Sequence, residues 1–293
     1  MVKLETYEWM VKPTPHRVWI EGKGILLYLA FFFIELGAAL YFVSLFFQSR
    51  PGMLLGWLLC LILGGGFHLA FLGKPWRCYR AVLKPGTSWI SRGMIFVIAF
   101  TLLGAIHLMT AWKGNAPLLL SVLMGLVALL EMIYAGFALS YVLAIPIWNT
   151  ALIPALYSIA SLWGGIGLLV VLNLLSGSEV ELMESWARVL LLAYGSLMLL
   201  YLLTMRYRSH TAAASIGRMV RGDLSFFFWG GVVLIGFLYP SLVNGMSYAL
   251  GPHGVSAGLL VTAILCEGVG DLSMRYCTLK GALYAPLIPA REI

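Results

Sequence analysis

Charged residues are scarce in this sequence. Only 11% of its 293 residues are Asp, Glu, Lys or Arg, 61% are hydrophobic, and the mean hydropathy is +0.93. A soluble globular domain has about 25% charged residues, so this composition excludes a soluble fold. The chain is expected to be an integral membrane protein.

Cysteine and histidine are also rare, which limits the cofactors that the chain can hold. The four cysteines have no C-x-x-C spacing, so neither an iron-sulfur or zinc site nor a disulfide framework is expected. His68 and His107 lie in apolar runs but fall in opposite leaflets, so they do not form a haem ligand pair at one depth. We therefore expect no metal, haem or iron-sulfur cluster in this chain.

Long apolar runs fill most of the sequence. A helix that rises about 1.5 Å per residue needs roughly 20 apolar residues to cross a hydrocarbon core of about 30 Å. The windows that meet this requirement are about 22–47, 53–72, 94–112, 118–145, 150–174, 185–205, 226–250 and 254–274. They predict an all-α integral membrane protein, residues 1–293 forming a single membrane domain of eight transmembrane helices in two four-helix bundles.

The basic residues are distributed unevenly between the two sides of these spans. All but three of the 19 Lys and Arg residues belong to the side of the two termini, the exceptions being Arg50, Lys113 and Arg188. The positive-inside rule places that side, and both termini, in the cytoplasm. The membrane topology thus explains the net charge of +7. The basic residues are expected to contact membrane lipid, and no nucleic-acid partner is expected.

The connection at residues 73–93 is longer than a tight turn requires. It alternates apolar and basic residues and is expected to lie as an amphipathic segment at the membrane interface. It either contacts lipid headgroups or forms a docking surface for an acidic or redox partner. The candidate docking residues are Trp76, Arg77, Arg80, Trp89 and Arg92.

Ionisable groups cluster inside the predicted spans, where each costs about 2.5–3.5 kcal/mol on insertion scales. Antiparallel alternation of the helices brings nearly all of them into one leaflet, with Glu35 deeper and Glu21 and Lys23 at the start of the first span. The group comprises His68, Glu131, Tyr134, Glu267, Asp271, Arg275, Glu35, Glu21 and Lys23. The pattern predicts a polar site shared by several helices.

Such a site suits a quinone. A quinone head needs a hydrogen-bond partner at each carbonyl, a proton-exchanging group nearby and an apolar path for its tail. Tyr134, His68 and the carboxylates provide these groups. The alternatives are that His68 is an interhelical hydrogen-bond partner, that Tyr134 is a packing residue, and that Asp271 and Arg275 pair only with each other at i, i+4.

Three segments resemble the NrfD/PsrC family of polysulfide-reductase-like membrane subunits. They are "HLAFLGKPWRCYRAVLKPGTSWISRG" (68–93), "YAGFALSYVLAIPIWNTALIPALYSIASLWGG" (134–165) and "EGVGDLSMRYCTLKGALY" (267–284). The resemblance implies an eight-span, cofactor-free anchor in the prokaryotic cytoplasmic membrane that exchanges electrons with a quinone, expected to be menaquinone. It also implies a four-cluster ferredoxin-like partner and a large catalytic subunit, often molybdopterin-dependent.

The resemblance also suggests roles for single residues. The family's Tyr-x-Gly tyrosine, which binds the quinone, matches Tyr134. From the residues themselves, either His68 or the Lys23/Glu21 pair is expected as the second quinone contact. At the start of the first helix the sequence reads "WIEGKG" where relatives have His or Asn, so Glu21 and Lys23 are candidates by position alone. Many family complexes place the iron-sulfur partner outside the cytoplasmic membrane, whereas the charge distribution here places the polar leaflet inward.

The remaining ionisable residues are candidates for proton transfer. We expect Glu131, Glu267 and Asp271 to relay protons, Arg275 to fix Asp271, and Glu35 to extend the path deeper into the membrane. Two alternatives remain. The chain is a secondary transporter whose carboxylates bind a coupling ion or substrate, or it is a purely structural anchor.

Overall fold

The computed structural model describes residues 8–114, 116–251 and 254–288. Within these ranges, eight helical spans are long and apolar enough to cross a membrane, which confirms the predicted all-α membrane protein. The spans are α2 (Gly24–Phe46), α3–η1–α4 (Arg50–Leu58, Leu59–Gly64, Gly65–Phe71), α5 (Trp89–Lys113), α6 (Leu118–Ser140), α7 (Leu152–Ser176), α8 (Glu181–Arg208), η3–α10 (Phe227–Leu238, Tyr239–Leu250) and α11 (Ala257–Lys280). Shorter elements are α1 (Glu8–Val11), β1 (Thr14–Pro15), η2 (Pro75–Val82), α9 (His210–Val220) and β2 (Leu283–Tyr284).

Capping interactions set several of the helix ends. The expected third span began near residue 94, but α5 begins at Trp89 because the Ser88 hydroxyl accepts the backbone N–H of Ser91 at 3.4 Å. The expected fourth span continued to residue 145, but α6 ends at Ser140, whose carbonyl accepts the Asn149 side-chain amide at 2.8 Å. Hydropathy windows do not register such polar caps.

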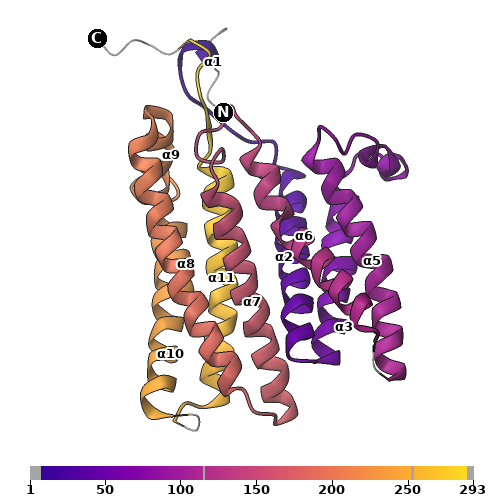
Figure 1. Cartoon of the computed structure of the whole chain (residues 1–293). Helices are drawn as coiled ribbons and strands as arrows, with labels where there is room; N and C mark the ends of the chain where they lie inside the picture. The colour runs from indigo at the N-terminus through magenta and orange to yellow at the C-terminus, as the bar shows by residue number, and fades with distance from the viewer. Residues whose placement is uncertain (1–7, 115, 252–253, 289–293) are drawn as a thin grey trace.

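The spans form two groups of four. α2, α3–α4, α5 and α6 make the first, and α7, α8, η3–α10 and α11 make the second; α2 and α7 pack together along the junction (Figure 1). Small residues allow this close approach. A Cβ added at Gly165 of α7 would lie 2.8 Å from the backbone of Leu40 in α2.

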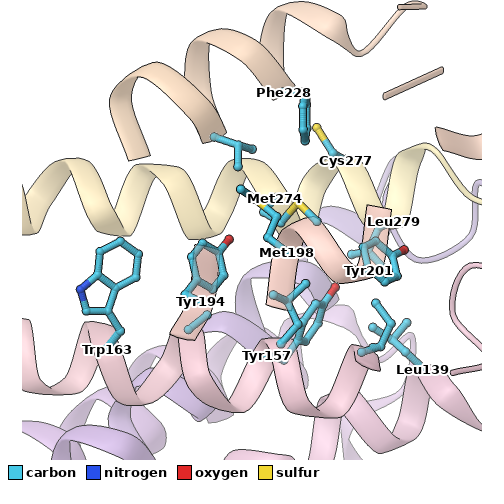
Figure 2. Packing of buried hydrophobic residues seen from close by; sticks show 14 of the residues in the cluster. Leu139, Tyr157, Trp163, Tyr194, Met198, Tyr201, Phe228, Met274, Cys277 and Leu279 are labelled. Carbon is cyan, nitrogen blue, oxygen red and sulfur yellow. The ribbon is translucent and has the colours of Figure 1, made fainter. Parts of the chain in front are cut away.

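The core of the second group is built from large side chains. Trp163 of α7 and Tyr194 of α8 pack with ring centroids 5.4 Å apart, and Met198 of α8 lies beside Met274 of α11 (Figure 2). The hydrophobic effect does not drive these side chains together, because lipid tails are as apolar as the protein core. Close van der Waals packing holds such helices in place.

Segments from both ends of the chain meet on one side of the bundle. β1 pairs antiparallel with β2, and the backbone N–H of His16 donates to the carbonyl of Ala282 at 2.9 Å. η2 and α9 lie on this same side (Figure 1). We call it the basic face, because it carries most of the Lys and Arg residues of the connections.

Candidate functional site

An apolar cavity of about 300 Å³ opens near the basic face. Its walls come from the segment before α2 and from α2, η1, α4, η2, α5 and α6. Its lining is almost wholly apolar, with the side chains of Trp19, His68 and Tyr134 bringing the polar atoms. The structure therefore brings together two of the predicted quinone-binding residues, Tyr134 and His68.

Phe31 contacts both polar side chains. Its ring lies edge-on to His68 at 5.6 Å and to Tyr134 at 5.7 Å between centroids. Tyr134 fits because α5 has a glycine beside it: a Cβ added at Gly93 would lie 2.0 Å from the tyrosine ring. Gly93 belongs to the "SWISRG" stretch, so its position was visible in the sequence, but its role was not.

Trp19 forms a further wall that sequence reasoning missed. Its ring stacks on Trp148 at 5.4 Å, and its backbone N–H donates to Nε2 of His16 at 3.1 Å. His16 is itself buried and shares a 2.8 Å hydrogen bond with the hydroxyl of Tyr284. The segment before α2 is thus held against the chain's C-terminal strand, and this places Trp19 at the cavity.

Glu21 and Lys23 lie outside the lining of this cavity. Glu21 pairs with Lys280 at the basic face, and the ammonium group of Lys280 holds the pKa of the Glu21 carboxyl below its usual value. Lys23 is exposed at the start of α2. Their predicted contact with a quinone has no support from this geometry.

A second polar site lies buried between α2, α7 and α11. The Nε of Arg275 donates to both carboxylate oxygens of Asp271 at 2.9 Å, and its Nη1 donates to Glu35. The Nη2 donates to the hydroxyl of Ser161 at 3.0 Å. The i, i+4 pairing of Asp271 with Arg275 was foreseen, but the third and fourth members come from helices distant in sequence.

This ion cluster, Glu35, Ser161, Asp271 and Arg275, is almost sealed from the surface. Arg275 is 2% exposed and Glu35 is fully buried. The guanidinium group also lies over the ring of Tyr157 at 4.3 Å. Oε1 of Glu35 has no hydrogen-bond partner among the described residues.

Glu131 lies between the cavity and the ion cluster. It is on α6, three residues before Tyr134, and is 1% exposed. It is within electrostatic range of both Tyr134 and Glu35. Neither of its carboxyl oxygens has a hydrogen-bond partner in the part of the chain that the structure describes. A buried acid without partners is uncommon, which makes Glu131 a candidate functional residue.

Glu267 is set apart from these groups. It lies on α11, one turn before Asp271, and faces α7, where its Oε2 would be 3.3 Å from a Cβ added at Gly167. The indole of Trp163 lies beside it. Glu267 therefore does not line the cavity, although it continues the row of carboxyl groups on α11.

The predicted docking residues fall into two kinds. Trp76, Arg77 and Arg80 are exposed on η2, and Trp76 is 89% exposed. Trp89 instead stacks on Phe137 at 4.7 Å. Arg92 covers the Trp89 ring and donates to two carbonyls of the loop before α5. Trp89 and Arg92 therefore stabilise this loop, while η2 carries the exposed basic and aromatic side chains.

The sequence also matches a known family over nearly its whole length. The family model described as polysulphide reductase, NrfD, matches residues 18–285. A search of curated proteins finds no match. Members of this family are membrane subunits of polysulphide reductase and related oxidoreductase complexes. The chain therefore belongs to the polysulphide reductase NrfD family and is a multi-pass membrane protein of that kind.

Proposed function

We propose that this protein is the quinone-reactive membrane subunit of a respiratory oxidoreductase complex, with menaquinone as its substrate. The observation that carries the proposal is the apolar cavity lined by Tyr134 and His68, both of which contact the ring of Phe31. Its volume of about 300 Å³ lies at the lower end of the range for small-molecule sites. A flat quinone ring with an oxygen at each end matches such a lining.

Tyr134 is the first proposed contact with the substrate. Among the described residues no hydrogen bond engages its hydroxyl, so it is free to donate to one quinone oxygen. We propose that His68, which also lines the cavity, serves the second oxygen. Phe31 and Trp19 hold the ring by aromatic contact.

The proton path begins at Glu131. Oxidation of a quinol releases two electrons and two protons, and reduction of a quinone takes up the same number. Glu131 is the carboxyl group next to Tyr134 along α6 and has no competing partner among the described residues. We propose that it exchanges protons with the substrate and with Glu35, that Asp271 and Glu267 continue the relay, and that Arg275 fixes Asp271.

The electrons pass to or from another chain. We propose a ferredoxin-like partner with four iron-sulfur clusters, itself joined to a large catalytic subunit, often molybdopterin-dependent. The exposed surface of η2, with Trp76, Arg77 and Arg80, lies at the face where the cavity is found and suits an acidic docking partner. We propose a prokaryotic cytoplasmic membrane, and the distribution of Lys and Arg supports an orientation with this face in the cytoplasm.

The substitution Tyr134→Phe tests the quinone site. It removes one hydroxyl and keeps the ring that packs on Gly93 and Phe31. Quinol turnover by the assembled complex is expected to fall about 10- to 100-fold, with the amount of complex unchanged. The matched control is Tyr141→Phe, just past the end of α6 and 63% exposed, which is expected to keep normal turnover. Normal turnover in Tyr134→Phe would remove this residue from the mechanism.

Purification in mild detergent tests the proposed partners. Mass spectrometry of the proteins that accompany the chain is expected to identify an iron-sulfur subunit and a large oxidoreductase. A chain that purifies alone from its native membrane and takes up a solute in liposomes would instead favour a transporter. The geometry gives a transporter less support, because Arg275 already donates to both oxygens of Asp271 and to one oxygen of Glu35, which a transported cation would need as ligands.

A further inference from the structure

The second and third spans separate toward the basic face. α3 packs along α5, and the Trp57 indole donates to the carbonyl of Thr101 at 3.0 Å. η1 still touches α5, but α4, the last part of the same span, has at most marginal contact with it. The apolar cavity lies where these two helices have parted.

The local sequence explains this separation. η1 is a π-helix, which carries an extra residue in its turn and so redirects the helix that follows. Gly64 packs tightly against α2, since an added Cβ would lie 2.4 Å from Ile34. The next two glycines have open space beside them: a Cβ at Gly65 would meet only the Cys60 carbonyl at 3.6 Å, and one at Gly66 would meet nothing within 4 Å.

The residues that line the cavity range from buried to exposed. Tyr134 and Phe31 at the inner end are 3% and 5% exposed. Leu61, Leu69 and Ile90 line the outer end and are 37%, 47% and 52% exposed. These three residues belong to membrane-spanning segments, so their exposed surface faces lipid.

We propose that this opening between α4 and α5 is the passage for the isoprenoid tail of the quinone. The α4–α5 opening is defined by Leu61, Gly65, Leu69, Ile90 and Met94. The inference rests on the proposed function, since it assigns the ring to the Tyr134 end of the same cavity. A tail that left the ring through this opening would enter the hydrocarbon core directly.

The role of the opening is geometric. An isoprenoid tail gains little by moving from lipid to an equally apolar channel, so the channel does not supply binding energy by the hydrophobic effect. It allows the ring to be bound while the tail stays in lipid. A side chain that fills the opening therefore excludes tailed quinones and leaves room for a ring without a tail.

Gly65→Leu and Gly66→Leu form a matched pair for the test. Both place a leucine on the same turn of α4, both have open space beside the glycine, and only Gly65 lines the cavity. Ile90→Trp and Ile95→Trp repeat the comparison on α5, because both are exposed and only Ile90 lines the cavity. The second pair keeps the test valid if a substitution on α4 disturbs folding.

The measurement is equilibrium binding to the full chain, with its native partners, in lipid nanodiscs. The probes are radiolabelled menaquinone with a long tail and menadione, which has the same ring without a tail. Gly65→Leu and Ile90→Trp are expected to weaken menaquinone binding at least about tenfold and to leave menadione binding unchanged. The two controls are expected to bind both probes normally.

Each other result has a distinct meaning. Menaquinone binding that is unchanged in Gly65→Leu and Ile90→Trp would overturn the passage and leave the proposed function standing. Equal losses for both probes would also overturn it, because the ring site itself would be disturbed. A phospholipid retained in the opening while menaquinone binds normally would assign the opening to an acyl chain. Failure of the unsubstituted protein to bind either probe would overturn the proposed function together with this inference.

Discussion

The cavity and the ion cluster are neighbours, but they differ in how their polar groups are hydrogen-bonded. Phe31 and Glu35 lie one turn apart on α2, the first lining the cavity and the second inside the ion cluster. In the ion cluster all three nitrogens of Arg275 are engaged, whereas in the cavity the Tyr134 hydroxyl has no hydrogen bond to any described residue. Polar groups bonded to one another, as around Arg275, hold a structure together, and polar groups left open to a cavity are available to a ligand.

Breaking the ion cluster is expected to have the largest effect on stability. Arg275→Met leaves Glu35 and Asp271 buried without their cation, which costs about 3–5 kcal/mol. The measurement is the thermal unfolding of the purified protein in detergent, together with the yield of folded protein. Adding Glu35→Gln and Asp271→Asn to this variant is expected to recover part of the loss, because the uncompensated charges are then removed.

The exposed ion pair between Arg218 and Asp223 provides the control. These groups lie 2.7 Å apart at the basic face, and the Asp223 side chain is 55% exposed. Because exposed pairs contribute about 0–1 kcal/mol, Arg218→Met is expected to change the thermal midpoint little. Equal losses in Arg275→Met and Arg218→Met would show that the ion cluster is not the stabilising element described above.

Glu131 lies near both regions, and its replacement is expected to impair quinol turnover without destabilising the ion cluster. Glu131→Gln keeps the volume of the side chain but cannot accept a proton from the substrate, so quinol turnover is expected to fall about 10- to 100-fold with little loss of stability. The pH dependence of turnover should change as well. Glu184→Gln is the control, since Glu184 is a buried acid near the other end of the bundle, bonded to Ser247 at 2.7 Å. Turnover that falls equally in both variants would contradict a specific role for Glu131.

Local patterns in the sequence predicted much of this arrangement. Hydropathy located the eight spans, because a membrane span must be apolar along its length. The i, i+4 spacing predicted the pairing of Asp271 with Arg275. Tyr134 and His68 were expected to share a site near one face, and both line the cavity.

Contacts between distant segments could not be predicted in the same way. Glu35 and Arg275 are far apart in the chain and meet only because α2 packs beside both α7 and α11. From the sequence, Glu35 was therefore expected as the deepest member of the ionisable group but not as a partner of Arg275, and Ser161 was not expected as a partner at all. Trp19 was overlooked because its place in the cavity depends on the pairing of β1 with β2.

Replacing Ser161 tests how much stability a single neutral hydrogen-bond partner adds to the ion cluster. Ser161→Ala removes the hydroxyl that accepts from Arg275 and donates to Glu35 at 3.3 Å, with an expected loss of about 1.5 kcal/mol. The control on the same helix is Ser158→Ala, whose hydroxyl donates only to the backbone carbonyl of Pro154 and whose loss is expected to be small. Thermal unfolding of the two variants compares them. A Ser158→Ala variant as unstable as Ser161→Ala would show that the effect belongs to α7 in general.

Low pH is expected to destabilise the protein through protonation of His16, which holds Trp19 at the cavity. This is the smallest of the four effects predicted in this comparison. Burial lowers the pKa of His16 to about 4, while the nearby Glu21 opposes this shift. The Nε2 of the neutral ring accepts the Trp19 N–H, so Nδ1 carries the proton and donates to Tyr284. The folded state binds a second proton on this ring less readily than the unfolded chain, whose His pKa is about 6.5. The stability that His16 contributes is therefore present above about pH 6.5 and is lost as pH falls toward 4.

Between pH 7 and pH 5.5 the expected loss of stability is about 1 kcal/mol, measured as the pH dependence of thermal unfolding. His16→Gln is expected to remove this dependence, and an unchanged dependence would assign the acid sensitivity to another group.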